Sequence, residues 1–312
     1  AKFNLSIRQL LKYDFKDGWI NYEARKKIVG LQKSIHPNEE SFGIPAHLVW
    51  KGKEACNNIF IHSEQGIGDE VLISSLYGEL NQLHKNIKIS CDKRLIAIFK
   101  RSFPGIDFLD KKKNFNVDAE TKHIFSFSLG KFLRKNKFDF QNNKKAWLSC
   151  NSSFESLLKN RFHKNKKKII GISWKSSQDI KKNIDLEYLI KIFPKDKYLI
   201  LNLQYGEINN EINAIESKYD HRIECLKEID YKNDLDKLCS LINICDLVIT
   251  TSNVTAHFAG ALSKKTFLLL STSPLFYWGE KGNSIWYPSI EIFRQKTPGD
   301  WTFPLHLLAK NI

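Results

Sequence analysis

Apolar and polar residues follow two alternating patterns along this 312-residue chain. Short continuous apolar runs, bounded by polar or turn residues, predict buried strands. We place these strands at residues 59–62, 87–91, 106–109, 123–127, 169–174, 198–203, 223–226, 247–250 and 266–270. The segments between them repeat apolar residues at helical spacing and predict helices at residues 71–83, 93–103, 154–158, 186–192, 207–218, 235–245 and 254–262.

The order of these elements predicts an α/β fold. Strand and helix alternate in two separate stretches, and such alternation is typical of a parallel, doubly wound sheet. A highly charged stretch at residues 144–168 separates the two. We therefore expect two Rossmann-like domains, at residues 31–150 and 168–312, joined by a linker at residues 151–167.

Residues 1–30 predict two short helices before the first domain. An apolar stripe runs from Phe3 to Leu11, and a second helix begins near Lys16 and contains Trp19. Two short helices cannot bury their apolar faces alone. The segment is either the last unit of a helical repeat array or a simple N-terminal helical cap, and the sequence leaves both interpretations open.

The net charge of the chain is strongly positive. It amounts to +15, from 49 Lys and Arg against 34 Asp and Glu, and the lysines are spread along the sequence. We interpret them as a solvated surface, with attraction of anionic ligands or of an anionic membrane surface as the alternative. A nucleic-acid partner is not expected, because the sequence contains no helix-turn-helix, zinc or aromatic RNA-binding motif.

Cysteine and hydropathy patterns indicate the compartment. The six cysteines form no Cys-x-x-Cys pair and most lie in or beside apolar segments, so we expect buried thiols. No apolar run approaches the roughly 20 residues of a membrane-spanning helix, and no signal-peptide pattern is present. These patterns predict a cytoplasmic protein. Its positive charge would also allow it to bind at the inner face of the membrane. The chain begins at Ala1 and contains no methionine, and a trimmed sequence, a fragment of a longer protein and missing methionines are the three interpretations left open.

The run from His62 to Leu72 carries the first chemical signal. It joins a predicted strand to a predicted helix, and Gly66 and Gly68 let backbone N–H groups approach a ligand at this turn. Asp69 lies at the mouth of the same turn, where α/β folds place their reactive groups. The alternative role for Asp69 is the N-cap of the following helix.

A second cluster of polar residues follows the strand at residues 247–250. Ser252 or Asn253 caps the next helix, whose N–H groups and positive dipole end make a site for an anion. Thr251, Ser252 and Thr255 can add hydroxyl donors. A diphosphate fits such a place, and an ordinary capped helix is the alternative.

The sequence predicts no metal site. Asp234 and Asp236 have the Asp-x-Asp spacing of a metal motif, but they lie at the start of a predicted helix, where Asp serves as an N-cap. No other group of His, Cys and carboxylate residues has the spacing of metal ligands.

Five segments of the chain carry a resemblance to a known family. Residues 64–69 and 252–262 resemble the two signatures of the ADP-heptose:lipopolysaccharide heptosyltransferase superfamily, and more closely its branch in which tetratricopeptide repeats precede the transferase. Residues 15–25, 170–175 and 286–301 resemble the last repeat, the first strand of the second domain and the C-terminal end of that branch. At Ser252 and Asn253 the chain departs from the Asp-Thr pair common in relatives, which leaves the donor open.

The resemblance implies a GT-B fold, in which two Rossmann-like domains face a cleft. It implies inverting, metal-independent transfer of a sugar from a nucleotide-diphospho-sugar, without a cofactor. Residues 31–150 would then bind the acceptor, a glycan or a protein, and residues 168–312 the donor. The final helix, near Leu305, is expected to pack on the acceptor domain. A non-catalytic nucleotide-sugar-binding scaffold is the alternative function.

The same resemblance assigns roles to single residues. Asp69 matches the general base that takes the proton of the acceptor hydroxyl. Lys175 matches a basic position that contacts donor phosphates, with a surface lysine as the alternative. Gln204 is a candidate contact for the nucleoside. His257 contacts a phosphate or is structural, and Trp174 supports the site or fills the core.

Overall fold

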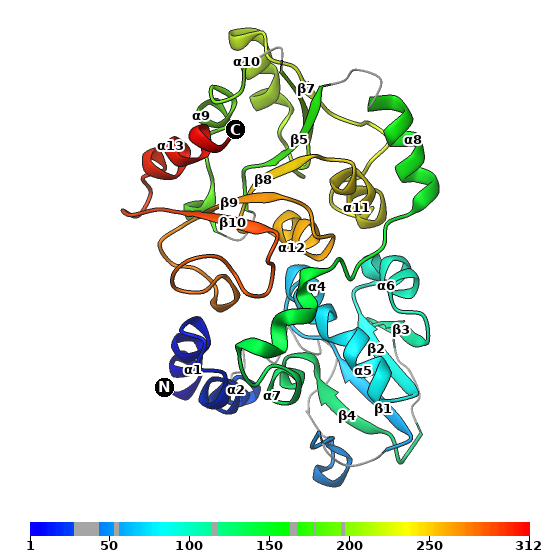
Figure 1. The fold of residues 1–312 in the computed structure, drawn as a ribbon. Coiled ribbons are helices and arrows are strands. Elements are labelled where there is room, and N and C mark those ends of the chain that lie inside the picture. The colour runs from blue at the N-terminus through cyan, green and yellow to red at the C-terminus, as the bar shows by residue number, and fades with distance from the viewer. Residues whose placement is uncertain (28–43, 53–55, 114–117, 163–166, 177–178, 195–196) are drawn as a thin grey trace. The chain divides into compact units, whose positions relative to one another are not determined.

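A computed structural model describes residues 1–27, 44–52, 56–113, 118–162, 167–176, 179–194 and 197–312 of the protein. The chain divides into two compact α/β units (Figure 1). The first unit contains Ala1–Ser149 and Leu275–Lys281, and the second contains Cys150–Pro274 and Gly282–Ile312. The predicted boundary between residues 30 and 31 lies outside the described residues.

The first unit is built on a parallel sheet with the strand order β3-β2-β1-β4. Its strands are β1 (Asn58–His62), β2 (Asn86–Cys91), β3 (Ile106–Asp110) and β4 (Lys122–Phe125). Its helices and 3-10 turns after β1 are α4 (Ile67–Ile73), η3 (Ser74–Leu76), α5 (Tyr77–Leu83), η4 (Lys93–Leu95), α6 (Ile96–Ser102), η5 (Ser126–Leu129), α7 (Gly130–Leu133) and η6 (Lys137–Lys144). Paired residues such as Ile59 and Ile87 are both buried, which accounts for the continuous apolar runs in the sequence.

The N-terminal helices are part of the first unit. They are α1 (Lys2–Leu11) and α2 (Phe15–Tyr22), followed by the turns η1 (Glu23–Lys27) and η2 (Ala46–Leu48). Trp19 is buried, and its indole N–H donates to the carbonyl of Arg134 at 2.8 Å. Gly130 allows this close packing, because a Cβ there would lie 2.5 Å from the Trp19 ring. The predicted helix pair is confirmed, and the repeat-array interpretation stays a prediction.

The second unit is built on a parallel sheet with the order β10-β9-β8-β5-β6-β7. Its strands are β5 (Lys168–Ser173), β6 (Tyr198–Asn202), β7 (Ile223–Glu224), β8 (Leu247–Thr251), β9 (Thr266–Leu270) and β10 (Ile290–Arg294). Its helices are α8 (Ser152–Phe162), α9 (Leu186–Ile190), α10 (Asn209–Tyr219), α11 (Leu235–Asn243), α12 (Val254–Ala261) and α13 (Thr302–Asn311). One buried cluster joins α9, α10 and Leu308 of α13 to the sheet, while α8 and α12 both contact α11 (Figure 1).

Each sheet has one point at which the strand order reverses. In the first unit β2 and β3 extend the sheet on one side of β1, and β4 joins it on the other. In the second unit β6 and β7 lie on one side of β5, and β8 to β10 on the other. Doubly wound sheets bind ligands outside the carboxyl ends of the strands at such points. The turns after β1, β4, β5 and β8 are therefore the places to look for chemistry.

One strand near the C-terminus is absent from the sequence prediction. The edge strand β10 (Ile290–Arg294) was not predicted, because it is short and lies among aromatic loop residues with little periodicity. The final helix contacts β9 and β10 of the second unit, and its expected packing on the acceptor domain stays a prediction. Its Leu308 is fully buried in the core of that unit, and this burial fixes the helix in place.

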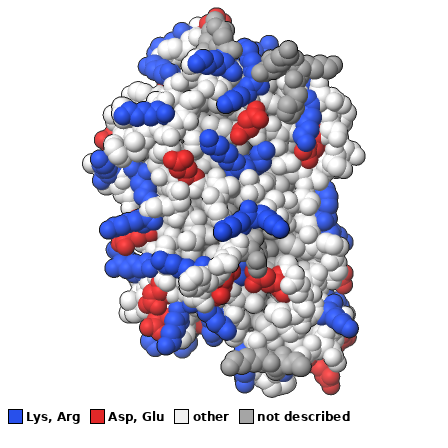
Figure 2. All heavy atoms as spheres, viewed as in Figure 1, with Lys and Arg blue, Asp and Glu red and all other residues white. Residues whose placement is uncertain are grey.

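The burial of the cysteines agrees only in part with the expectation of buried thiols, and the basic residues are spread over the surface as expected. Cys91, Cys239 and Cys245 are buried, but Cys225 is exposed because it follows the two-residue edge strand β7. Lysine and arginine side chains are distributed over the whole face drawn in Figure 2, with acidic residues between them. Within the residues described, no helix has the length and apolar character needed to cross a membrane.

Candidate functional site

The glycine loop of the first unit connects β1 to α4. The helix starts at Ile67, earlier than the predicted residue 71, with Gly66 as its N-cap. Asp69 is consequently the third helical residue and not the N-cap. Its Oδ2 accepts the backbone N–H of Gly66 at 3.1 Å, and its side chain is partly exposed. The carboxylate thus helps to hold the turn and stays accessible at the reversal point between β1 and β4.

A buried ion pair holds the residues just before this turn. The carboxylate of Glu64 accepts two hydrogen bonds from the Arg25 guanidinium, from Nε and Nη2, each at 2.7 Å. Both side chains are fully buried. Glu64 also accepts the backbone N–H of Phe127 at 2.9 Å, and Arg25 donates to the hydroxyl of Ser128 at 3.0 Å. The network therefore joins the ends of β1 and β4 to the turn η1.

The next residue of α4, Glu70, anchors the helix to its neighbours. It is buried, pairs with the Lys111 ammonium at 2.7 Å and accepts the backbone N–H of Asp92 at 2.9 Å. Burial raises the pKa of Glu70 to about 7, although Lys111 acts to lower it. The helix that carries Asp69 is thus fastened to the carboxyl end of β2 through its own side chain.

In the second unit, Asn253 organises the turn between β8 and α12. Its side-chain oxygen accepts the N–H of Thr255 at 3.0 Å, which makes Asn253 the N-cap of α12. Its amide donates to the Ser173 hydroxyl at 2.8 Å and to the carbonyl of Lys175 at 3.1 Å. The cap predicted at this position is confirmed. It also ties the end of β5 to the start of α12, across the reversal point of the sheet.

The other residues of the turn are buried around it. Thr251 donates through its hydroxyl to the carbonyl of Lys182 at 2.7 Å. Ser252 and Thr255 are also buried, with exposed fractions of 6% and 1%. The structure therefore places Thr251, Ser252, Asn253 and Thr255 in one turn, as the sequence predicts, with their polar groups largely directed at the protein itself.

Gln204 and Lys175 are held by neighbours in the same region. The side-chain oxygen of Gln204 accepts the backbone N–H groups of Trp174 and Lys175, at 3.1 and 2.8 Å. The Lys175 ammonium forms an ion pair with Glu211 of α10. The indole of the fully buried Trp174 donates to the same carboxylate at 3.0 Å. Trp174 therefore fills the core and at the same time positions the partner of Lys175.

His257 lies inside α12 and is buried. One ring nitrogen, Nδ1, shares a hydrogen bond of 2.8 Å with the hydroxyl of Tyr287. Burial lowers the pKa of His257 to about 3, with a smaller contribution from Lys182. The ring is therefore neutral at physiological pH, and its hydrogen bond agrees with the structural role left open by the sequence.

A pocket of about 290 Å³ lies beside Gln204 at the carboxyl ends of β6 and β7. Tyrosine, amide and aliphatic side chains line it, with Lys227, Asp230 and Lys232 at its charged part. Other residues of its lining are Asn202, Tyr205, Gly206, Ile208, Asn209, Cys225, Leu226, Ile229 and Tyr231. This mixture of apolar walls and a few polar groups is typical of a small-molecule pocket.

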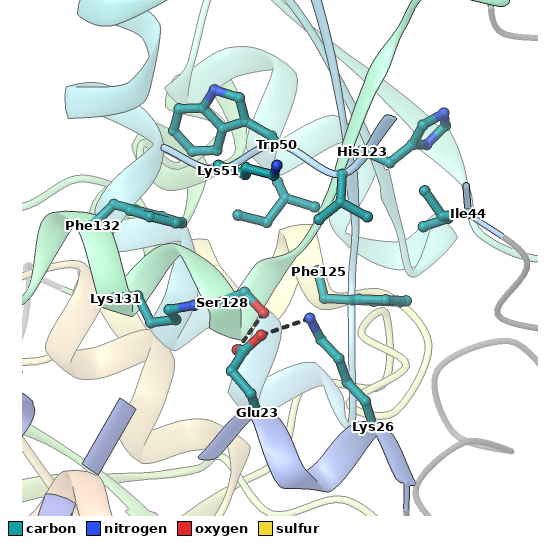
Figure 3. A pocket seen from close by; sticks show the side chains of 12 residues that line it. Glu23, Lys26, Ile44, Trp50, Lys51, His123, Phe125, Ser128, Lys131 and Phe132 are labelled. Carbon is teal, nitrogen blue, oxygen red and sulfur yellow. Dashed lines mark hydrogen bonds and ion pairs between the residues drawn. The ribbon is translucent and has the colours of Figure 1, made fainter. Parts of the chain in front are cut away.

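The first unit contains a second pocket, of about 310 Å³, beside the edge strand β4 (Figure 3). Its walls include Trp50, Phe125 and Phe132, and its charged residues are Glu23, Lys26, Lys51 and Lys131. The carboxylate of Glu23 accepts hydrogen bonds from Lys26 and Ser128, each at 2.7 Å, as Figure 3 shows. Sequence reasoning did not find this pocket, because its residues come from four separate segments.

The Asp-x-Asp pair, Asp234 and Asp236, lies at the start of α11 and is not part of a metal centre among the described residues. The carboxylate of Asp234 accepts the N–H of Lys237 at 3.1 Å, so Asp234 is the predicted N-cap of α11. In the described part of the chain, no group of three or more His, Cys, Asp or Glu residues has a geometry that could hold a metal ion.

Sequence reasoning also missed the importance of Arg25 and Glu64. Both lie in segments that carry the family resemblance, but neither was assigned a role. Their neighbours in the sequence are polar, Glu23, Lys26 and Lys27 on one side and Ser63 and Gln65 on the other, so no local pattern marked either residue as buried.

No protein-family model matches the chain. Among curated proteins, Protein FlbA of Caulobacter vibrioides is 25% identical over 309 residues, which covers 91% of this chain. The chain spans about half of the length of that relative, 50%.

Several solved structures have a similar fold. The glycosyl transferase family 9 protein of Veillonella parvula has a TM-score of 0.57 and 11% identity, over 80% of this chain and 87% of that one. ADP-heptose LPS heptosyltransferase II of E. coli has a TM-score of 0.55 and 12% identity, over 81% and 97%. E. coli heptosyltransferase WaaC with ADP has a TM-score of 0.54 and 8% identity, over 81% and 98%. The predicted fold class is confirmed: the chain has the two-sheet α/β fold of these GT-B glycosyltransferases.

Proposed function

We propose that this protein is a glycosyltransferase that moves a sugar from a nucleotide-diphospho-sugar to a hydroxyl group, with inversion and without a metal. The single observation that carries the proposal is the pair of turns at the two reversal points. One presents the carboxylate of Asp69, and the other presents the capped N-terminus of α12. A base and an anion site are the two parts that such a transfer needs.

In the proposed reaction the second unit binds the donor. The diphosphate lies at the turn from Thr251 to Thr255, where backbone N–H groups and the positive end of α12 meet its charge. Lys175 exchanges its partner Glu211 for the departing phosphate, whose developing charge it stabilises. The nucleoside occupies the pocket beside Gln204. Gln204 itself supports the pocket wall, since its side-chain oxygen already accepts two backbone N–H groups.

The first unit binds the acceptor and supplies the base. Asp69 accepts the proton of the attacking hydroxyl as the new C–O bond forms and the nucleoside diphosphate leaves. A positioned base of this kind contributes about 10²–10⁴-fold to the rate. The acceptor occupies the pocket beside β4, whose aromatic walls and lysines fit a ligand with apolar and anionic parts. Both glycans and protein side chains supply the hydroxyl that this chemistry requires.

The proposal is tested by separating donor binding from transfer. A thermal-shift screen against nucleoside diphosphates and their sugars identifies the donor. Wild type and Asp69→Asn are then compared in a transfer assay with that donor. We expect the variant to bind the donor normally and to lose about 10²–10⁴-fold in kcat. Donor binding without turnover in the wild type would favour the non-catalytic nucleotide-sugar-binding alternative.

We further propose that the protein associates peripherally with anionic membrane surfaces. The net charge of +15 supports this association. Co-sedimentation with anionic lipid vesicles, compared with neutral ones at low and high salt, measures it. Binding that neither depends on lipid charge nor weakens with salt contradicts the proposal, since surface charges are screened beyond roughly 10 Å at 0.1 M salt.

A further inference from the structure

The glycine loop contains one residue in an unfavourable backbone conformation. Gln65, between Glu64 and Gly66, has a φ of 62°. Residues other than glycine, asparagine and aspartate rarely adopt a positive φ, because the Cβ then approaches the backbone. Such a conformation persists only where the surrounding structure holds it. The contacts of Gln65 therefore show what fixes the loop.

The N-terminal helices supply those contacts. The amide Nε2 of Gln65 donates to the hydroxyl of Tyr22, the last residue of α2, at 2.8 Å. The preceding residue, Glu64, is held by the two hydrogen bonds from Arg25. Two consecutive loop residues are thus bound by side chains from the same short segment, 22–25.

That segment is itself rigidly packed. Tyr22 is buried and contacts the rings of Trp19, Phe127 and Phe276, with centroids 5.6 to 5.8 Å apart. The Arg25 guanidinium lies 4.9 Å from the centroid of the Tyr22 ring. The two side chains that hold the loop are therefore locked against the core and against each other.

The network continues to the pocket beside β4. Arg25 donates to Glu23 at 3.1 Å, and Glu23 accepts the hydroxyl of Ser128 at 2.7 Å. Burial raises the pKa of Glu23, but the charges of Arg25 and Lys26 outweigh it and lower the pKa to about 2. Glu23 is therefore charged at neutral pH, where it pairs with Arg25 and Lys26.

Asp69 lies close enough to this segment to influence it. The negative charge of Asp69 is one of the contributions that raise the pKa of Tyr22, after burial and the charge of Glu64. On its other side Asp69 accepts the N–H of Gly66, the residue that follows Gln65. Any change in the backbone of Gln65 therefore moves the atom that orients the carboxylate.

We propose that the N-terminal helical segment is a built-in part of the catalytic machinery, in which Tyr22 and Arg25 are positioning residues for the glycine loop and for Asp69. Tyr22 holds Gln65 in its positive-φ conformation, and Arg25 holds Glu64 beside it. This role of the segment rests on the proposed function, because it acts through the base. The holding of the loop itself does not depend on that function.

Two matched pairs of variants test the proposal. Tyr22→Phe removes the hydroxyl that Gln65 binds and keeps the ring. Tyr77→Phe is its control, because Tyr77 is equally buried and its hydroxyl has no hydrogen-bond partner among the described residues. Arg25→Gln breaks the buried pair with Glu64. Arg134→Gln is its control, since Arg134 is fully buried and pairs with Glu79 at 2.8 Å, and the other hydrogen bonds of its side chain go to Ser75, Leu133 and Asn143 instead of the loop.

The first measurement is amide hydrogen exchange of the peptide that spans residues 63–69. We expect Tyr22→Phe to accelerate this exchange about fivefold, which is the value of one net hydrogen bond of about 1 kcal/mol. Tyr77→Phe should leave it unchanged. Arg25→Gln should accelerate it more than Arg134→Gln, with both proteins compared at equal global stability. Equal effects within either pair would overturn the proposal.

The second measurement separates positioning from simple loss of stability. We expect Tyr22→Phe and Arg25→Gln to lower kcat, by up to about 100-fold for Arg25→Gln, and to leave the KM for the donor unchanged. The effect of Tyr22→Phe should shrink in a Gln65→Gly background, because glycine adopts a positive φ without help. Additive effects of these two substitutions, or a kcat equal to that of the controls, would overturn the positioning role.

The proposed function and the further inference are refuted by different results. A wild-type protein that transfers no sugar with any donor refutes the proposed function, and the exchange comparison then still decides whether the segment holds the loop. Transfer by the wild type together with unchanged loop exchange in Tyr22→Phe and Arg25→Gln refutes the further inference alone.

Discussion

Acidification from pH 7 to pH 5 is predicted to destabilise the protein through His257. Burial lowers the pKa of this histidine from its usual 6.5 to about 3. Because the folded-state pKa is lowered, the unfolded chain binds a proton below about pH 6.5 that the folded protein does not bind. The contribution of His257 to stability is therefore present above pH 6.5 and is lost as the pH falls towards 3.

The size of this effect follows from the shift. Between pH 7 and pH 5 the unfolded imidazole takes up most of one proton and the folded one almost none, which costs about 2 kcal/mol. Glu70 acts in the opposite direction, since burial raises its pKa to about 7 against the effect of Lys111, and the folded protein gains a proton over the same interval. The wild-type curve contains both contributions. Only its difference from a His257 variant isolates the imidazole.

Urea unfolding at pH 7, 6 and 5 measures the difference. The stability advantage of wild type over His257→Gln should shrink by about 2 kcal/mol between pH 7 and pH 5. Tyr287→Phe removes the hydrogen bond to the ring but keeps the imidazole buried, so this variant should retain the wild-type pH dependence. Parallel curves for wild type and His257→Gln over this range would refute the reasoning.

Two further matched pairs test packing and capping. Gly130→Ala places a Cβ 2.5 Å from the Trp19 ring and should lower the free energy of unfolding by about 1–3 kcal/mol. Gly78→Ala places its Cβ with no atom from outside its own helix within 4 Å among the described residues, and should raise the free energy of unfolding by about 0.5–1 kcal/mol. Thermal denaturation distinguishes the two variants, and a change of the same sign in both contradicts the packing. Asn253→Ala and Asp234→Ala each remove an N-cap worth about 1 kcal/mol. Only Asn253→Ala should also weaken nucleoside diphosphate binding in calorimetry, and equal weakening by both would remove the diphosphate from the α12 turn.

The fold was largely predictable because its strands are short, apolar and buried, and because parallel order follows from strand–helix alternation. The edge strand β10 (Ile290–Arg294) escaped prediction, since an edge strand is only half covered and its pattern is diluted by the loops around it. The start of α4 was predicted too late in the sequence, because Gly66 serves as its N-cap. A glycine carries no side-chain signal that distinguishes a cap from a loop.

The candidate site was predictable as far as single turns are concerned. Asp69 and Asn253 were recognised because each lies at a strand–helix junction with glycine or capping residues beside it. The contacts between distant segments were not predictable in the same way. Arg25 meets Glu64 across 39 residues, and Gln204 meets Lys175 across 29. Such pairings depend on how strands and helices are assembled, which local periodicity does not contain.

The proposed mechanism depends most directly on where a nucleotide-sugar binds. A crystal structure of the protein with the donor selected by the thermal-shift screen decides this. We predict that the diphosphate lies within hydrogen-bond distance of the backbone N–H groups at the start of α12, between Thr251 and Thr255, with the nucleoside beside Gln204. A diphosphate bound anywhere else in the protein would contradict the proposed donor site and the mechanism built on it.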